Sequence, residues 1–292
     1  MSGQVTDVRL PRHLVPVLYT LELVPFIVPD NFTIRGYVQI DMLCRQAADN
    51  VTLHVADLLL QNNTVRLEEK TTKKEVPITG HDYDTDREFY IAKLGENLQP
   101  GKVYVIKIEY TAYLKDNLKG FYRSVYKDRA TGQDEYIAVT QFQATDARRA
   151  FPCFDEPGIK AKYSVSLGRL RSMSSISNMP IQEKGVAMEG TEEYVWDRYE
   201  QSVKMSTYLV AFVVSKFQFR ETTREDNKVR FRIWSEPSSL DQTEYARDIG
   251  PKILKFFEDY FQVKFPLPKQ DMIAIPDFAA GAMENWGLIT YR

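Results

Sequence analysis

Short runs in which apolar and polar residues alternate dominate the first two-thirds of the chain, and this pattern constrains the fold more than any other feature. The run VYVIKIEY at 103–110 alternates in this way, as do the segments 38–42 and 51–55. A period of two residues is the signature of a strand with one buried face. Polar turn clusters at 61–64 and 99–102 separate such runs. Many short strands joined by polar turns predict a large antiparallel β sandwich or saddle.

The pattern changes after Phe217. A strand predicted at 229–234 is followed by the serine pair at 238–239, which can cap a helix. Apolar residues then recur with helical spacing over 245–260. Pro251 lies within this segment and should kink or divide the helix.

The sequence therefore predicts two domains. The length of 292 residues independently favours about two. Apolar runs at 272–275 and 288–291 predict further strands after the helix, so helix and strand alternate in the C-terminal part. We expect a mostly β N-terminal saddle or sandwich domain at residues 1–216, followed at residues 217–292 by the start of a mixed α/β domain.

Charge and hydropathy argue against two classes of partner. The formal net charge of −2, from 38 basic and 40 acidic residues, offers no basic excess for nucleic acid. The longest apolar run, 208–214, is too short to span a bilayer and is interpreted as a buried strand. Residues 1–7 carry no apolar signal segment. As written, the chain is expected to be neither anchored in a membrane nor addressed for secretion.

Cysteines and glycosylation motifs give a mixed indication of compartment. Cys44 and Cys153 could form a disulfide, but each is better interpreted as a small buried hydrophobe. Asn-x-Thr motifs make Asn31, Asn50 and Asn62 candidate glycosylation sites, which favours an extracellular protein. This preference conflicts with the missing signal segment. The simplest reconciliation is that the chain is part of a longer protein.

Two acidic segments resemble functional motifs but fit them poorly. The segment DYDTD at 82–86 begins like a calcium loop, yet Arg87 stands where the EF-hand pattern needs Gly. An acidic hairpin turn is the better interpretation. Asp155 and Glu156 are adjacent, and adjacent residues of an extended segment point to opposite sides. They suit a rigid structural turn rather than the facing carboxylates of a glycosidase.

The sequence contains no complete metal or nucleophile motif. His13, His54 and His81 have no partner at helical spacing, and no His-Glu-x-x-His or Cys-x-x-Cys pattern is present. Phosphate-loop and serine-hydrolase patterns are absent as well. The chain's own residues therefore predict no metal site and no complete catalytic apparatus.

The closing phrase PDFAAGAMENWGLITYR, residues 276–292, has two interpretations that its residues leave open. It can be a tight turn between two strands, where Gly281 supplies backbone freedom and small alanines fit a crowded sheet. Alternatively, its small residues leave the backbone bare, so that an extended peptide can pair with it as an added strand. Glu284 beside this strip could then accept a charge-assisted hydrogen bond from an ammonium group.

Three segments carry a family resemblance. Residues 281–285 read GAMEN, residues 140–157 read TQFQATDARRAFPCFDEP, and residues 10–19 open the first predicted sheet. In this order along the chain they resemble the gluzincin zinc aminopeptidases of the M1 family. The resemblance implies a β saddle followed by a thermolysin-like catalytic domain, which agrees with the division that the sequence pattern predicts near Lys216. It also implies a hydrolase that removes residues from the N-termini of peptides.

The resemblance assigns roles to particular residues. Gly281 and Ala282 would contact the substrate backbone, and Glu284 would bind the free α-amino group. Gln143 would lie at the mouth of the first side-chain pocket. The substrate-binding set implied in this way consists of Gln143, Gly281, Ala282, Met283, Glu284 and Asn285.

Gln143 also bears on specificity and location. Cytosolic and antigen-trimming members usually resemble Gln-Phe-Glu here, whereas aminopeptidase N-like members resemble the Gln-x-Gln of residues 141–143. A neutral amide should accept neutral and apolar first residues. Together with the glycosylation motifs, this implies a glycoprotein on the extracellular face of the plasma membrane or secreted. A cytoplasmic location is the alternative, because the chain shows neither signal nor anchor.

The family's zinc motif, His-Glu-x-x-His with a later Glu, does not occur before Arg292. We therefore expect zinc to belong to a longer parent, and this chain alone to bind none and to be inactive. It would be the N-terminal, substrate-gripping portion of a zinc metalloaminopeptidase that removes neutral residues. The alternative is a catalytically inactive short relative that serves as a peptide- or partner-binding module or scaffold. Expected partners are peptides with a free N-terminus and a second copy of the chain as a homodimer, with no nucleic acid and no membrane contact except through a segment absent here.

Overall fold

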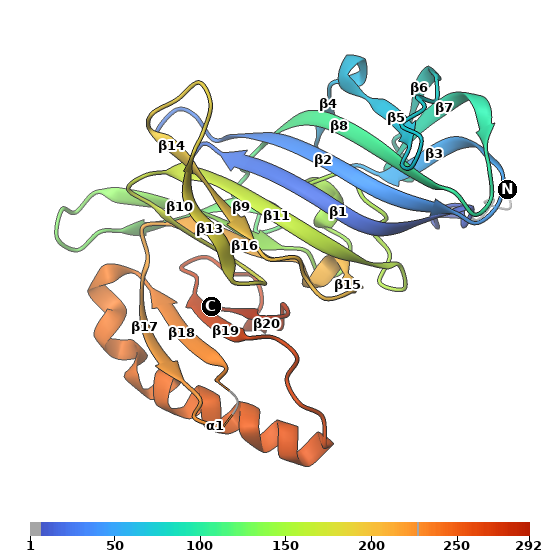
Figure 1. The fold of residues 1–292 in the computed structure, drawn as a ribbon. Coiled ribbons are helices and arrows are strands. Elements are labelled where there is room, and N and C mark those ends of the chain that lie inside the picture. The colour runs from blue at the N-terminus through green and yellow to red at the C-terminus, as the bar shows by residue number, and fades with distance from the viewer. Residues whose placement is uncertain (1–6, 227) are drawn as a thin grey trace, which may run out of the picture.

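The computed structural model describes residues 7–226 and 228–292. Within these residues the strands form sheets of nine, five, four and three strands, accompanied by one α-helix and short 3₁₀ turns. Figure 1 shows the largest sheet arching over the molecule, with the helix and the five-stranded sheet beneath it. The start of the chain, where the sequence shows no signal segment, lies largely outside the described residues.

The nine-stranded sheet confirms the alternating pattern read from the sequence. Its strands are β1 (Leu14–Pro25), β2 (Thr33–Cys44), β4 (Leu59–Leu60), β5 (Arg66–Glu69), β8 (Val103–Tyr113), β11 (Lys160–Leu170), β13 (Ile181–Ala187), β14 (Tyr194–Tyr199) and β15 (Met205–Ser206). Along β2 the alternating side chains of Val38, Ile40 and Met42 are buried. One face of the sheet therefore lines the larger hydrophobic core, and the other faces solvent. The sheet is not the wholly antiparallel one that the sequence had predicted, because β1 and β11 pair in parallel.

Two smaller sheets complete the N-terminal part. The three-stranded sheet contains β3 (Ala48–His54), β6 (Ile78–Asp84) and β7 (Phe89–Leu98). The four-stranded sheet contains, in spatial order, β12 (Ser174–Ser177), β16 (Phe212–Ser215), β10 (Asp134–Gln141) and β9 (Gly120–Lys127). The acidic segment 82–86 lies at the β6–β7 hairpin, where the Asp84 carboxylate accepts from the backbone N–H of Arg87 at 3.0 Å, so the hairpin interpretation is confirmed.

The apolar run at 208–214 is not the continuous strand that the sequence suggested. Its first residues belong to the 3₁₀ turn η3 (Thr207–Leu209), and pairing begins only in β16. The physical reason is the side chain of Asn178. Its amide donates to the backbone O of Leu209 at 2.8 Å, and its oxygen accepts from the backbone N–H of Ala211 at 2.9 Å. These backbone groups are satisfied by a side chain instead of a neighbouring strand.

The C-terminal part is the start of a mixed α/β unit, as expected. Its sheet contains, in spatial order, β17 (Gln218–Thr223), β18 (Arg230–Ser235), β19 (Lys269–Ala274), β21 (Leu288–Tyr291) and β20 (Ala282–Met283). The two central pairings, β18 with β19 and β19 with β21, are parallel. The outer pairings are antiparallel. The long crossover between β18 and β19 contains α1 (Glu244–Phe261).

Helix α1 differs in two ways from its sequence-based prediction. It begins at Glu244 after the 3₁₀ segment η4 (Pro237–Thr243), because the hydroxyls of Ser238 and Ser239 donate to the Glu236 carboxylate instead of capping a helix. Pro251 lies inside the helix without dividing it. No helix within the described residues is long and apolar enough to cross a membrane.

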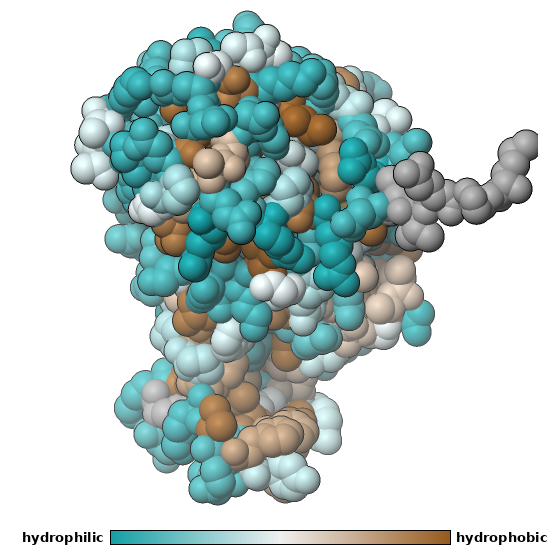
Figure 2. Space-filling view, turned by 90° about the vertical axis from the view of Figure 1, so that its right-hand side faces the viewer, coloured by the Kyte–Doolittle hydropathy of each residue, from teal (hydrophilic) through white to brown (hydrophobic). Residues whose placement is uncertain are grey.

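The apolar stripe of α1 points away from the sheet. Among the helical residues described, Gly250 and Glu258 are the buried ones. Large apolar side chains lie exposed along the rest of the helix, namely Tyr245, Ile253, Phe256, Phe257, Tyr260 and Phe261. Figure 2 shows brown surface on the narrow lower part of the molecule, where the helix lies. The helical period was therefore read correctly, but in this chain it does not mark a buried face.

The smaller hydrophobic core joins the two parts of the chain. Tyr122, Ile137 and Val213 contribute to it from the four-stranded sheet, while Ile273 and Met283 contribute from the five-stranded sheet. Shared packing of this kind couples the two sheets energetically. The division at residues 216 and 217 remains a prediction about where one folding unit ends.

The two cysteines are placed as expected. Cys44 and Cys153 are buried, and neither forms a disulfide within the described residues. Both belong to the larger hydrophobic core. The interpretation of each as a small buried hydrophobe is confirmed.

The shared core makes a prediction about cooperativity. Ile273→Ala removes buried methyl groups from this core and should lower the free energy of unfolding by about 2–4 kcal/mol. Because both sheets use the core, circular dichroism and tryptophan fluorescence should shift together to lower urea. Ile253→Ala, on the exposed face of α1, is the matched control and should change stability by less than about 0.5 kcal/mol. Separate transitions for the two signals would show that the two parts unfold independently.

Candidate functional site

The closing phrase forms an edge strand, a turn and a second strand. Ala282 and Met283 of β20 pair with Tyr291 and Thr290 of β21, and β20 is the last strand on that side of the sheet. The tight turn proposed from the sequence is therefore present. Because β20 is at the edge, it also meets the geometric requirement for adding an extended peptide.

The glycine that this turn requires is Gly287, not Gly281. Gly287 has φ of +84°, a backbone conformation that favours glycine. A Cβ at this position would lie 2.3 Å from the backbone O of Asn178. Gly281 does not have a positive φ, and a Cβ there would meet no atom within 4 Å. The space beside Gly281 is open, so its role is not the backbone freedom expected from the sequence.

The strip 281–285 has an outward set and a buried set of side chains. Ala282 and Glu284 are exposed, as is Gly281. Met283 is fully buried in the smaller core, and Asn285 is buried with its amide 3.4 Å from the Thr290 hydroxyl. A ligand in contact with Met283 or Asn285 would therefore meet backbone atoms. Within the part of the chain that the structure describes, the Glu284 carboxylate makes no hydrogen bond or ion pair.

The segment before the strip is anchored to β9 of the four-stranded sheet. The Asp277 carboxylate accepts from the Ser124 hydroxyl at 3.0 Å and from the backbone N–H of Val125 at 3.3 Å. The Tyr122 hydroxyl donates to the backbone O of Asp277 at 2.8 Å. Burial, with a smaller contribution from Asp277, raises the pKa of Tyr122, so this phenol remains a donor at neutral pH. The loop leading to the strip cannot move without breaking these bonds.

The segment after the strip is anchored to the opposite edge of the same sheet. Asn178 follows β12, and its side-chain amide donates to the backbone O of Trp286 at 2.9 Å. The close approach of Asn178 to Gly287 seats the turn against this strand. Because β9 and β12 are the two outer strands of the four-stranded sheet, the strip is attached to that sheet at both of its edges.

Gln143 emerges from the same four-stranded sheet. It follows β10 and is exposed, and the chain then continues into η2 (Ala147–Arg149). Two residues earlier, the side-chain oxygen of Gln141 is buried and has no hydrogen-bond partner within the described residues. A buried acceptor without a protein partner is rare in folded proteins. Sequence reasoning did not select Gln141, although it lies in the segment that carried the family resemblance.

A network of ion pairs lies at η2, a few residues after Gln143, and two of its side chains, Arg148 and Asp155, are buried. Arg148 donates to the Asp155 carboxylate at 3.1 Å and to Glu88 at 2.8 Å. The other oxygen of Asp155 accepts from the Thr207 hydroxyl at 2.8 Å. Burial raises the pKa of the Asp155 carboxyl, and Thr207 and Arg148 limit the rise. The Glu156 carboxylate instead accepts from the backbone N–H of Leu10 and from the Arg12 guanidinium. The prediction of a structural turn at Asp155 and Glu156 is confirmed.

The histidines are engaged in separate structural contacts. His54 Nδ1 accepts from the backbone N–H of Asp155 at 3.2 Å, while His13 and His81 contact the backbone O of Asn50 and the Tyr90 hydroxyl. No group of three or more His, Cys, Asp or Glu side chains among residues 7–226 and 228–292 is arranged to hold a metal ion. These residues do not fit a zinc centre.

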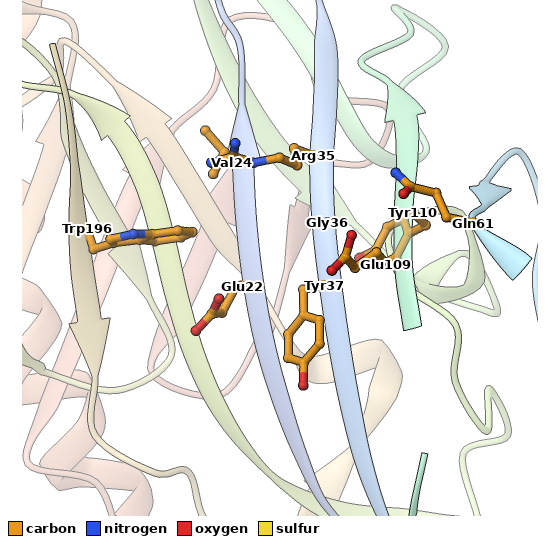
Figure 3. Close-up of a pocket in the computed structure, with 9 residues that line it drawn as sticks. All are labelled: Glu22, Val24, Arg35, Gly36, Tyr37, Gln61, Glu109, Tyr110 and Trp196. Carbon is orange, nitrogen blue, oxygen red and sulfur yellow. The ribbon is translucent and has the colours of Figure 1, made fainter. Parts of the chain in front are cut away.

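A hollow of about 490 Å³ lies on the solvent-facing side of the nine-stranded sheet. Figure 3 shows its lining residues, which lie on strands of that sheet except for Gln61 directly after β4: Glu22, Val24, Arg35, Gly36, Tyr37, Gln61, Glu109, Tyr110 and Trp196. None of the predicted substrate-binding residues lines it. The hollow is open and mixes both charges with two kinds of aromatic ring, so it does not define a ligand class.

The candidate glycosylation sites differ in accessibility. Asn62 is exposed, whereas Asn31 and Asn50 are half-buried. The Asn62 side-chain oxygen accepts from the Tyr83 hydroxyl at 2.7 Å. Asn31 and Asn50 each accept from the threonine hydroxyl of their own motif. Glycosylation remains a prediction, for which Asn62 has the most accessible side chain.

Known protein families match the chain on both sides of the predicted division. Residues 15–209 match the family model described as the peptidase M1 N-terminal domain, and residues 245–292 match that of the peptidase family M1 domain. The chain belongs to peptidase family M1. The family resemblance of the sequence is thereby confirmed.

Curated relatives in the family are aminopeptidases. The chain is 37% identical over 286 residues to endoplasmic reticulum aminopeptidase 1 of Rattus norvegicus, covering 98% of the chain and 30% of that protein. It is 40% identical over 284 residues to aminopeptidase M1 of Arabidopsis thaliana, covering 97% and 31%. It is 37% identical over 292 residues to aminopeptidase Ey of Gallus gallus, covering 97% and 30%. This M1 chain thus spans about 30% of the length of these relatives, whose similar identities do not single out the aminopeptidase N-like group.

The buried imidazole of His54 predicts a pH dependence of stability. Burial, followed by the nearby Arg148, lowers the pKa of His54 from 6.5 to about 3. The unfolded chain therefore binds the proton between these values, and stability is lost as the pH falls below 6.5. The loss at pH 5 should reach about 2 kcal/mol.

Urea titrations of the wild type and His54→Gln at pH 7 and pH 5 measure this effect. Glutamine keeps a polar side chain but cannot take up the proton. Its loss of stability between the two pH values should be smaller than that of the wild type by about 2 kcal/mol. Asp155, whose pKa moves in the opposite direction, is present in both proteins and cancels from the comparison. Equal losses in the two proteins would contradict the assignment.

Proposed function

We propose that residues 1–292 form the N-terminal, substrate-gripping portion of a zinc metalloaminopeptidase. The observation that carries the proposal is the position of Ala282 in a sheet-edge strand, with the exposed Glu284 directly after that strand. Membership of the M1 family and the names of its aminopeptidase relatives support the reaction class. The chain's own task in this proposal is to bind and orient the peptide.

The proposed grip has a backbone contact and a charged contact. An extended peptide would pair with the free edge of β20, where Gly281 and Ala282 leave the backbone accessible. The Glu284 carboxylate would accept a charge-assisted hydrogen bond from the peptide's terminal ammonium group. An aminopeptidase must distinguish a chain end from a chain middle, and only the end carries this ammonium group.

Gln143 supplies a neutral polar group that is exposed after β10 of the adjacent sheet. The neutral amide of Gln143 places no charge at the pocket, so neutral first residues are the proposed substrates. With the glycosylation motifs, this supports a glycoprotein that is secreted or on the extracellular face of the plasma membrane.

In a zinc-dependent aminopeptidase the metal supplies an activated water for attack on the first peptide bond. The described residues offer no donor set for that metal. The proposed contribution of this chain is therefore to hold the terminal residue in a fixed orientation, which lowers the entropic barrier to any subsequent step.

The role of Glu284 predicts discrimination between free and blocked N-termini. In calorimetric titrations of the 292-residue chain, a tripeptide with a free amine should bind about 10- to 150-fold more tightly than its N-acetylated form, which lacks the charge-assisted bond. Glu284→Gln and Glu284→Ala should abolish most of this difference and leave the acetylated peptide unaffected.

Glu189→Gln is the matched control, because Glu189 is an exposed carboxylate in the hairpin between β13 and β14. It should retain the full discrimination. If Glu284→Ala binds the free-amine peptide as tightly as the wild type, Glu284 is only part of a structural turn. Binding without any preference for the free amine would favour a general peptide-binding module.

Gln143 predicts the charge preference of the site. Gln143→Glu introduces a carboxylate that attracts a cationic first side chain and repels an anionic one. The ratio of affinities for lysyl and glutamyl tripeptides should rise by about tenfold, with the leucyl peptide little changed. Gln182→Glu adds the same charge at an exposed position in β13 and should leave the ratio unaltered. Equal ratios in all three proteins would place Gln143 away from the first side chain.

A further inference from the structure

Lys269 is a buried lysine at the first position of β19. Its ammonium group donates to the backbone O of Ser177 at 2.5 Å, to Asp271 Oδ2 at 2.6 Å and to the backbone O of Gly287 at 2.9 Å. A lysine ammonium has three hydrogens and no acceptor capacity, so these contacts use all of its hydrogen-bonding groups. The group is fully satisfied although it is removed from water.

The three acceptors belong to separate parts of the molecule. Ser177 ends β12 of the four-stranded sheet, Asp271 lies in β19, and Gly287 is in the turn after the strip 281–285. Asn178, beside Ser177, holds the adjacent Trp286 carbonyl. Residues 286 and 287 are thus bonded by two side chains, one from each sheet, at the point where the strip turns into β21.

The second oxygen of Asp271 is also occupied. The indole N–H of Trp234 donates to Asp271 Oδ1 at 3.2 Å. A buried ion pair of this kind contributes little net stability, because desolvation of both charges offsets their attraction. Its more specific effect is geometric, since the charged groups are satisfied only when all their partners are in place.

We propose that Lys269 is a positioning residue that fixes the turn at 286–287 to β12 and thereby holds β20 and Glu284 in place for a peptide N-terminus. Lys269 itself touches no substrate in this arrangement. Glu284 precedes the clamped turn, and Gln143 extends from β10 of the sheet to which the clamp is attached. The peptide-binding consequence rests on the proposed function, whereas the clamp itself does not.

The test uses the double variant Lys269→Met with Asp271→Asn in the full chain. Both charges are removed together, so that neither is left buried and unpaired, and asparagine can still accept from Trp234. Hydrogen exchange should accelerate at least tenfold at the amides of Leu288 and Arg292, which bond to the backbone O of Asn285 and of Gly281. The affinity for a free-amine tripeptide should fall by about tenfold, and its preference over the acetylated form should shrink.

The matched control is Arg224→Met with Glu258→Gln. The side chains of this pair are exposed to a similarly small extent. The pair joins the segment after β17 to α1, with 2.8 Å between Arg224 Nη2 and Glu258 Oε2, and Arg224 also pairs with the more exposed Asp226. The control double variant should lower the melting temperature while leaving the peptide affinity and the exchange of Leu288 and Arg292 unchanged. If the two double variants alter affinity and local exchange equally, or the first alters neither, Lys269 has no positioning role.

Two further readouts separate the possible failures. If the wild type binds neither peptide, the proposed function fails, but the exchange rates of Leu288 and Arg292 still test the clamp. If the Lys269 double variant does not fold, Lys269→Arg is the second variant, because it keeps the charge beside Asp271 but cannot place one compact donor against all three acceptors. It should also increase the exchange of Leu288 and Arg292, and unchanged exchange in this variant would overturn the proposal.

Discussion

Packing of the four-stranded sheet against the five-stranded sheet is the interaction on which the candidate site depends. Strand β20 has two residues and one neighbour, too little pairing to hold a strand by itself. It is kept in place because Met283 packs into the shared core and because Asp277 and Trp286 are bonded to opposite edges of the four-stranded sheet. The four-stranded sheet of the N-terminal part therefore supplies the surface against which the strip 281–285 packs.

Electrostatics near the two proposed binding segments follow a common rule. Two buried charged groups lie near these segments. Asp155 bonds Arg148 of η2, which follows Gln143, and also Thr207. Lys269 bonds the Ser177 carbonyl and the Gly287 carbonyl, which follows the strip 281–285. Burial lowers the pKa of Lys269, and Asp271 opposes that change. Such groups are costly unless every partner is present, so they favour a single arrangement of the segments that they connect. The exposed Glu284 contrasts with them, because its carboxylate is open to an external partner.

Sequence periodicity predicted where strands and helices form better than it predicted which of their faces are buried. The alternation at 103–110 became β8, and the family was correctly recognised. The helical period at 245–260 gave α1 but not its exposure, because period alone does not say which face meets a neighbour. The strand expected at 208–214 was interrupted by Asn178, whose bonds to Leu209 and Ala211 span about thirty positions of sequence.

Local sequence patterns also failed to identify two residues of the candidate site, Gly287 and Lys269. Gly281 drew attention because it sits among small residues, yet the backbone conformation that requires glycine is at Gly287. Lys269 gave no signal, because its importance arises from the Ser177 carbonyl, far away in the chain. Long-range contacts of this kind follow from sheet order, which local patterns do not specify.

The shortness of β20 limits how much of a ligand this edge can read. A strand of two residues offers backbone pairing to only the first few positions of an added peptide. Backbone hydrogen bonds are the same for nearly every amino acid, so pairing alone would not select a sequence. In the proposed site the terminus of the ligand would be recognised, while the remainder of its chain would be free to vary in composition and length. The short length of β20 would then explain two properties together, namely acceptance of many peptide sequences and selection for a free N-terminus.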